Sequence, residues 1–119
     1  MSEILFAARA RNGVVRSVEL NETSLEIVRA TTTCELSRTV IRAEHAAEVL
    51  RLLAAGDGCA TLRGPDGQNL AVAVLELDAS VTMQRLRRSR ADGLAVVLRG
   101  DEITALRTGL LRLAAEVAA

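Results

Sequence analysis

Residues Val40–Glu44 read VIRAE, and residues Val97–Asp101 read VLRGD, 57 positions further along the chain. The same spacing brings VELN at Val18–Asn21 onto LELD at Leu75–Asp78 without a gap. Similarity at one fixed spacing is the sequence signature of an internal repeat. These matches therefore predict that the second half of the chain repeats the structure of the first.

A third match lies near the end of each half. LRLLAA at Leu50–Ala55 corresponds to LRLAAE at Leu111–Glu116, with the spacing increased by four residues. Four residues are about one helical turn, so an insertion of this length inside a helix leaves the apolar face pointing the same way. We therefore interpret residues 1–119 as one domain made of two repeats, at about 1–56 and 57–119.

Each repeat is expected to contain four strands followed by one helix. Runs rich in β-branched residues favour strands, and the turn residues between them favour hairpins. RNG at Arg11–Gly13 is a hairpin signal, and GPDG at Gly64–Gly67 marks a turn in the second repeat. The expected strands lie near residues 3–11, 14–20, 23–30 and 36–42 in the first repeat, and near 59–63, 69–77, 80–88 and 93–99 in the second.

The two helices are expected at about residues 43–55 and 101–117, each with an apolar stripe at helical spacing. GDG at Gly56–Gly58 ends the first helix, and Asp101 is expected to cap the second. The stripes comprise Ala46, Val49, Leu50 and Leu53, and then Ile103, Leu106, Leu110, Leu113 and Val117. The expected fold class is α+β, an antiparallel sheet with helices on one side.

Two strands of the second repeat are apolar at nearly every position. LAVAVLEL at Leu70–Leu77 and GLAVVL at Gly93–Leu98 lack the alternation of a half-exposed strand. Strands of this kind are buried on both faces. Two helices cover only one face of an eight-strand sheet, so the other face is covered by curling of the sheet or by a second subunit. The sequence therefore predicts a homo-oligomer, in the first instance a dimer.

The core has to be built almost without aromatic residues, because Phe6 is the only one among 119 residues, half of which are hydrophobic. All fifteen basic residues are arginine, and fifteen acids balance them to a net charge of zero. A dedicated nucleic-acid-binding protein usually has a basic excess, because neutralising phosphates supplies much of its affinity. The charge balance argues against that role for the whole chain, but not against a local basic patch.

The sequence offers few of the side chains that carry enzyme chemistry. His45 is the only histidine and is expected at a partly exposed position on the first helix. With Cys34 and Cys59 it makes a set too small and too widely spaced for the usual zinc site. The absence of lysine excludes a P-loop and a lysine Schiff base. The chain is expected to be non-enzymatic, with no cofactor and no metal.

A cytoplasmic location is expected, without a membrane partner. Residues 1–13 do not read as a signal peptide. No stretch reaches the roughly eighteen uninterrupted apolar residues of a membrane span. In the cytoplasm Cys34 and Cys59 are expected to be reduced, and we expect both to be partly buried.

The stretch MQRLRRSRADG at Met83–Gly93 concentrates four arginines at one expected hairpin. Alternate side chains of a strand share a face, so Arg85 and Arg87 continue the face that begins with Val81. A basic patch on a sheet can follow the backbone of a single-stranded nucleic acid. The candidate nucleic-acid-binding residues are Arg9, Arg11, Arg16, Arg85, Arg87, Arg88 and Arg90.

The arginine cluster has a second interpretation, as the solvated end of a hairpin. In this interpretation the arginines pair with Asp92, Asp78 or Glu76. The corresponding stretch of the first repeat, Val28–Leu36, contains only Arg29, so the repeat does not need the cluster in order to fold. The sequence leaves both interpretations open.

Two copies of a unit of four strands and a helix resemble the arrangement of the Pur-repeat, Whirly and single-strand-binding transcription-coactivator group. The VELN and LELD segments and the VIRAE and VLRGD segments carry the repeat, and the resemblance covers nearly the whole chain as topology. It implies a curved antiparallel sheet that contacts single-stranded DNA or RNA, with helices that pack behind it or mediate dimerisation. Binders of that group use a basic excess and aromatic stacking platforms, for which this chain has Phe6 alone.

Two functional hypotheses follow from the sequence. The first is a non-enzymatic intracellular module that assembles, or binds another protein, through an apolar sheet face. The alternative is a regulatory protein that binds single-stranded nucleic acid through arginines on the sheet.

Overall fold

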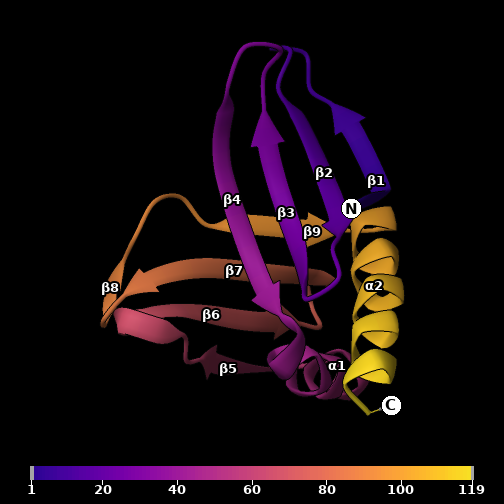
Figure 1. Cartoon of the computed structure of the whole chain (residues 1–119), viewed down its shortest axis with the longest axis vertical. Helices are drawn as coiled ribbons and strands as arrows, with labels where there is room; N and C mark the ends of the chain where they lie inside the picture. The colour runs from indigo at the N-terminus through magenta and orange to yellow at the C-terminus, as the bar shows by residue number, and fades with distance from the viewer. Residues whose placement is uncertain (1, 119) are drawn as a thin grey trace.

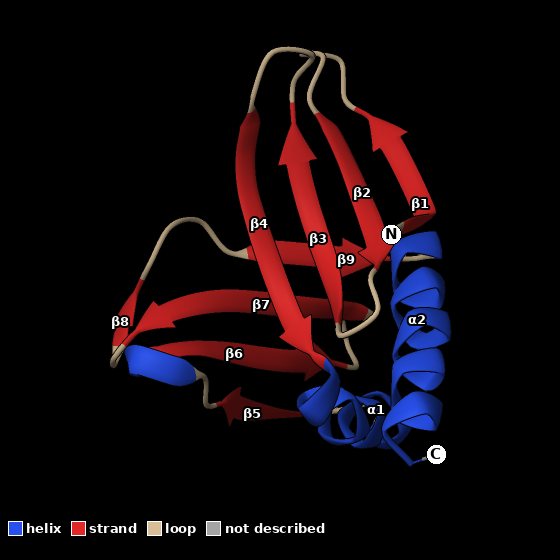
Figure 2. Ribbon diagram, viewed as in Figure 1, coloured by secondary structure: helices blue, strands red, loops and turns tan. Residues whose placement is uncertain are grey.

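The computed structural model describes residues 2–118, and it shows an α+β fold with two antiparallel sheets and two helices (Figures 1 and 2). The first half of the chain forms the first sheet and α1, and the second half forms the second sheet and α2. Figure 1 shows the strands of the second sheet running across those of the first, with both helices at one side of the crossing.

Each strand of the first sheet pairs with the next strand of the chain, in the order β1-β2-β3-β4. These strands are β1 (Glu3–Arg9), β2 (Val15–Leu20), β3 (Ser24–Ala30) and β4 (Glu35–Arg42), followed by the 3-10 turn η1 (Ala43–His45) and by α1 (Ala46–Ala55). The expected strands of the first repeat are confirmed to within about two residues at each end.

The second sheet is built around β7, which pairs with β6 on one side and with both β8 and β9 on the other. Its elements are β5 (Gly58–Leu62), the 3-10 turn η2 (Pro65–Gly67), β6 (Gln68–Leu75), β7 (Ser80–Arg87), β8 (Arg90–Ala91) and β9 (Val96–Arg99), followed by α2 (Asp101–Ala118). The expected strand at 93–99 is therefore shorter, and the two-residue strand β8 lies just before it, within the expected hairpin at Met83–Gly93.

The expectation of one continuous sheet is wrong, because β4 and β5 do not pair. Between them the chain forms α1 and then turns at Gly56 and Gly58, whose φ angles of 77° and 139° suit glycine. The two sheets instead face each other across a common core. An open sheet of eight strands would leave a broad apolar face in water, and folding it into two facing layers removes that cost.

One hydrophobic core joins both sheets and both helices. Alternate side chains of each strand point into it, as for Leu25 and Ile27 of β3, which are fully buried. The buried apolar residues are Val18, Leu20, Leu25, Ile27 and Ile41 from the first sheet, Leu62, Leu70, Val72, Val74, Val81, Met83, Val96 and Leu98 from the second, and Ala46, Val49, Leu53, Ala105, Leu106, Leu110 and Leu113 from the helices. The core therefore depends on both halves of the chain.

In the single chain, the apolar strands of the second repeat are fully buried on one face only, so their burial on both faces by a second subunit stays a prediction. In β6 the side chains of Leu70, Val72 and Val74 are buried, and the alanines between them are only half-buried. The run then ends in solvent, where Leu75 is 42% and Leu77 102% exposed. Alanine is apolar but small, so a strand can carry it on an open face without the usual polar alternation.

The apolar stripe of α2 meets the core over most of its length. Leu106, Leu110 and Leu113 are buried as expected, whereas Val117 is 61% exposed near the end of the helix. The carbonyl of Gly100 accepts the first hydrogen bonds of the helix, at 3.0 and 3.2 Å. The expected cap is therefore one residue too late, because Asp101 is the first residue of the helix itself.

Gly109 lets α2 lie close to the first sheet. A Cβ atom at this position would lie 2.4 Å from Cδ1 of Leu25 and 2.9 Å from Cδ1 of Leu5. Both distances are shorter than van der Waals contact, and Leu25 is fully buried, so it has little room to move. Glycine is needed at position 109 because any Cβ atom there would overlap with these two leucine side chains.

We expect Gly109→Ala to lower the free energy of unfolding by about 1–3 kcal/mol, because overpacking of the core outweighs the gain in helix propensity of up to about 1 kcal/mol. Urea denaturation followed by circular dichroism measures the difference. Thr108→Ala, at the exposed neighbouring position of α2, is the control and should change stability by no more than about 0.5 kcal/mol. An equally stable Gly109→Ala protein would contradict the close approach of α2 to β3.

Candidate functional site

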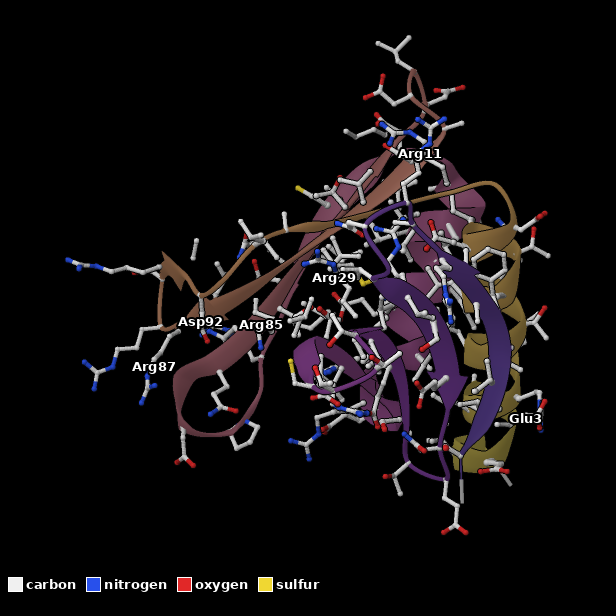
Figure 3. All side chains as sticks on the ribbon, turned by 90° about the horizontal axis from the view of Figure 1, so that it is seen from above. Glu3, Arg11, Arg29, Arg85, Arg87 and Asp92 are labelled. Atoms are coloured by element: carbon white, nitrogen blue, oxygen red, sulfur yellow. The ribbon has the colours of Figure 1, made fainter. Side chains whose placement is uncertain are left out.

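The seven candidate arginines do not form one continuous patch. Arg9, Arg11 and Arg16 belong to the β1–β2 hairpin of the first sheet, and the other four belong to the second sheet. Figure 3 shows Arg11 and Arg87 at different corners of the molecule, with Arg85 between Arg87 and the centre. The structure divides the seven among a hairpin tip, an inter-sheet contact and a groove.

The first place is the tip of the β7–β8 hairpin, where Arg87, Arg88 and Arg90 are exposed around a hollow of about 520 Å³. The turn is held by the backbone N–H of Arg88, which donates to the carbonyl of Gly67 at 2.6 Å. None of the salt bridges between described residues, within 4.0 Å, involves these three arginines. The expected pairing with Asp92, Asp78 or Glu76 is therefore wrong at that distance.

Arg85 occupies a different place, between the two sheets. It continues the inward face of β7 after Val81 and Met83, as expected, and its Nη1 donates to the carbonyl of Arg38 in β4 at 3.4 Å. Gly93 covers the guanidinium, since a Cβ there would lie 2.6 Å from Nη2. Arg85 is thus half-buried in an inter-sheet contact and is less accessible than the three arginines of the hairpin tip.

The third place is a groove of about 510 Å³ beneath the β1–β2 hairpin. Figure 1 shows the upper ends of the strands of the first sheet extending beyond β9, so the second sheet does not cover this part of the first. The groove lies there, beside the start of α2, and its lining residues are Phe6, Ala8, Arg9, Ala10, Asn12, Val14, Arg16, Arg29, Arg99, Asp101 and Glu102. We call this set the arginine groove.

Arg16 is fixed in the arginine groove by a two-point salt bridge to Glu102. Its Nε and Nη2 atoms donate to the two carboxylate oxygens at 2.6 and 2.5 Å. The side chain of Glu102 is 10% exposed and that of Arg16 is 33% exposed. This pair joins β2 to the first turn of α2, and it neutralises Arg16.

Arg29 and Arg99 were missed among the candidate residues. Arg29 lies directly opposite Arg16 in the β2–β3 pairing and is half-buried. The period of two along β3 was the available signal, since it places Arg29 on the same inward face as Leu25 and Ile27. No sequence signal places Arg99 in the same groove as Arg29, because they belong to different sheets.

Phe6 also lines the arginine groove, at the edge of the core. It is half-buried, so part of the ring faces the groove and part packs against buried side chains. The one aromatic side chain of the protein therefore lines the same groove as Arg16 and Arg29, next to the N-terminus of α2.

In its middle rows the outer face of the second sheet has no charged side chain; Arg99 lies beyond them, at the end of β9. Cross-strand pairs connect Cys59 to Ala73, Ala73 to Thr82 and Thr82 to Val97 in one row. Small side chains leave a shallow hollow of about 450 Å³ on this face. The face consists of Cys59, Thr61, Ala71, Ala73, Thr82, Gln84 and Val97, and we call it the uncharged face.

The outer face of the first sheet differs, because charged side chains are linked on it. The carboxylate of Glu26 accepts hydrogen bonds from Asn21, Ser24 and Arg38. Arg38 also donates to Glu35, and this hydrogen bond holds the pKa of the Glu35 carboxyl below its usual value. These groups satisfy one another, so they stabilise the sheet and leave no carboxylate unpaired for chemistry.

Of the two cysteines and the histidine, only Cys59 lies on one of these surfaces. Cys34 and Cys59 are free thiols, and both are exposed, so the expectation of partial burial is wrong. Cys34 lies in the β3–β4 turn, whereas Cys59 belongs to the uncharged face. His45 is partly exposed in η1, as expected. Among residues 2–118, no three His, Cys, Asp or Glu side chains are placed to hold a metal ion.

No helix in the described part of the chain is both long enough and apolar enough to cross a membrane.

Comparison with known proteins gives no family or relative: no family model matches the chain, no curated protein matches it, and no solved structure matches it.

We expect Glu102→Gln to lower the free energy of unfolding by about 1–3 kcal/mol, because it leaves Arg16 and Arg29 side by side without the carboxylate that separates their charges. The loss should shrink at high salt, which screens the repulsion. Denaturant titrations at two ionic strengths measure both effects. Glu44→Gln, which breaks the exposed pair of Glu44 with Arg42, is the matched control, with an expected change of no more than about 1 kcal/mol.

Proposed function

We propose that the protein is a non-enzymatic assembly module in which the uncharged face binds the same face of a second copy. The observation that carries this proposal is the absence of charge in the middle rows of the face of β5, β6, β7 and β9, in a chain of which 25% of the residues are charged. Charged side chains are costly to bury in an interface, and their absence removes that cost.

The small side chains of the uncharged face support contact between sheets. Ala71, Ala73 and Thr82 stand in adjacent rows and leave the backbone of β6 and β7 close to the surface. Facing sheets usually lie about 10 Å apart, and small residues allow that spacing or a shorter one. The exposed Leu75 lies at one end of β6 and adds apolar area at the rim.

The size of the face predicts a dimer of modest affinity. Eight residues of β6 extend about 26 Å, and four strands cover about 19 Å, so the flat area is about 500 Å² per copy. Stable interfaces commonly bury about 800 Å² per partner. The dimer should therefore dissociate on dilution.

We further propose that the two halves of the chain are copies of one unit and that the arrangement is of the Pur-repeat and Whirly kind. The first half forms four antiparallel strands and then one helix. The second forms five strands and then one helix, and its strands pair in chain order when the two-residue β8 is set aside. The matched segments VIRAE and VLRGD lie at corresponding places, where the last strand of each half leads into its helix. A cytoplasmic location remains part of this proposal.

Ala73→Arg should convert the dimer to a monomer, because it places a charge at the centre of the uncharged face. Size exclusion with light scattering over a range of concentrations measures the change in mass. Ala47→Arg, at an exposed position of α1, is the matched control and should leave the dimer intact. A wild-type protein that stays monomeric at about 1 mM would refute assembly through this face.

Binding of single-stranded nucleic acid is the second candidate function, favoured by the three exposed arginines at the β7–β8 tip. Arg87, Arg88 and Arg90 form no salt bridge with a described residue, so their charges are available to phosphates. The tip has no aromatic side chain for base stacking, which limits its affinity and makes it dependent on salt.

Changing all three tip arginines to alanine should abolish oligonucleotide binding at low salt. In the wild type, log K against log salt should have a slope of about −2, since each phosphate contact on a single strand contributes roughly −0.7. Fluorescence anisotropy with a labelled single strand measures both quantities. Retention of wild-type affinity by the triple variant, or no binding by the wild type at low salt, would exclude the tip as the contact surface.

A further inference from the structure

The arginine groove carries more positive charge than its own carboxylates neutralise. Its lining contains Arg9, Arg16, Arg29 and Arg99. It contains two carboxylates, of Asp101 and Glu102, and Glu102 is taken up by Arg16. Arg9 follows Ala8 in β1 and points to the opposite face of the sheet, since Ala8 pairs with Arg16 and Arg9 with Val15. Arg29, Arg99 and one carboxylate remain, which leaves an excess of about one positive charge in this part of the described chain.

The pairing of Arg16 with Arg29 makes this excess costly. They are direct neighbours across two antiparallel strands, and like charges in that position repel each other. Arg29 forms no salt bridge and no side-chain hydrogen bond with another described residue within the usual distances, although it is half-buried. The fold therefore holds a cation in a partly enclosed place without supplying an anion for it.

The shape of the groove suits a small molecule that has one anionic end and one flat, apolar part. Its volume of about 510 Å³ lies in the range of ordinary ligand sites. Phe6 and Ala8 form an apolar wall from β1, and the arginines lie along the adjoining strands and at the end of β9. The start of α2, an 18-residue helix, adds the favourable field of a helix N-terminus.

We propose that the arginine groove binds a dianionic phosphoryl group, held by Arg29 with Arg99, as part of a nucleotide whose base lies against Phe6. A phosphate monoester carries close to two negative charges at neutral pH, enough to compensate both Arg29 and Arg99, and a guanidinium binds it through two parallel hydrogen bonds. The site lies on the first sheet and at the start of α2. It therefore depends neither on the uncharged face nor on the hairpin tip.

Thermal unfolding in the presence of anions tests the site. Sodium phosphate should raise the melting temperature more than sodium chloride does at the same ionic strength, and adenosine monophosphate should act at about tenfold lower concentration than phosphate because of stacking. At ten times its dissociation constant, the nucleotide should raise the melting temperature by about 5 °C. Calorimetric titration of the nucleotide then gives the affinity directly.

Arg29→Gln should remove the response to phosphate and to the nucleotide. At low salt, the free variant should be at least as stable as the wild type, because the substitution ends the repulsion from Arg16. If Arg29→Gln is less stable because its structure is disturbed, Arg99→Gln, at an exposed position, serves as the test variant in its place. The matched control is Arg63→Gln, because Arg63 follows β5 at the opposite edge of the second sheet from β9.

Oligonucleotides with and without a 5′-phosphate identify the source of the phosphoryl group. If the phosphorylated strand binds more tightly than the free nucleotide, the phosphoryl group belongs to the end of a strand. If the free nucleotide binds more tightly, the ligand is the nucleotide itself. Equal binding of both strands would overturn the assignment of a dianion. The proposal also fails if phosphate protects no more than chloride, or if Arg29→Gln and Arg63→Gln respond alike.

Discussion

The mutual covering of two apolar sheet faces is the constraint on which the rest of this structure depends. Each sheet turns one set of alternate side chains inward, and neither has enough helix to cover that set alone. The core has no fully buried aromatic ring, so its stability comes from many aliphatic contacts shared between the halves. The close approach of α2 at Gly109 closes the side of this core next to β1 and β3.

The crossing of the sheets also determines which surfaces stay open. Because the strands of the second sheet run across those of the first, the far end of the first sheet extends past β9, and the arginine groove forms there. For the same reason the outer face of the second sheet has no helix against it. Binding surfaces in this protein are thus the parts of the two sheets that the common core does not use.

The elements themselves were predictable, but their arrangement was not. Turn residues and β-branched runs located the strands, and helical spacing identified Leu106, Leu110 and Leu113 as core residues. Local patterns do not state which strands pair, so the separation of β4 from β5 was missed. The arginine cluster at 85–90 was found by density along the chain, whereas Arg29 and Arg99 come together only through the fold.

The dependence of the core on both halves has a consequence for synthesis on the ribosome. The first sheet and α1 are complete at residue 55, but the side chains that cover Leu25 and Ile27 belong largely to the second half. While the ribosome adds the remaining residues, the apolar face of the first sheet has no permanent cover. A nascent chain of this protein therefore exposes apolar surface until α2 has been made, and exposed surface of this kind favours aggregation.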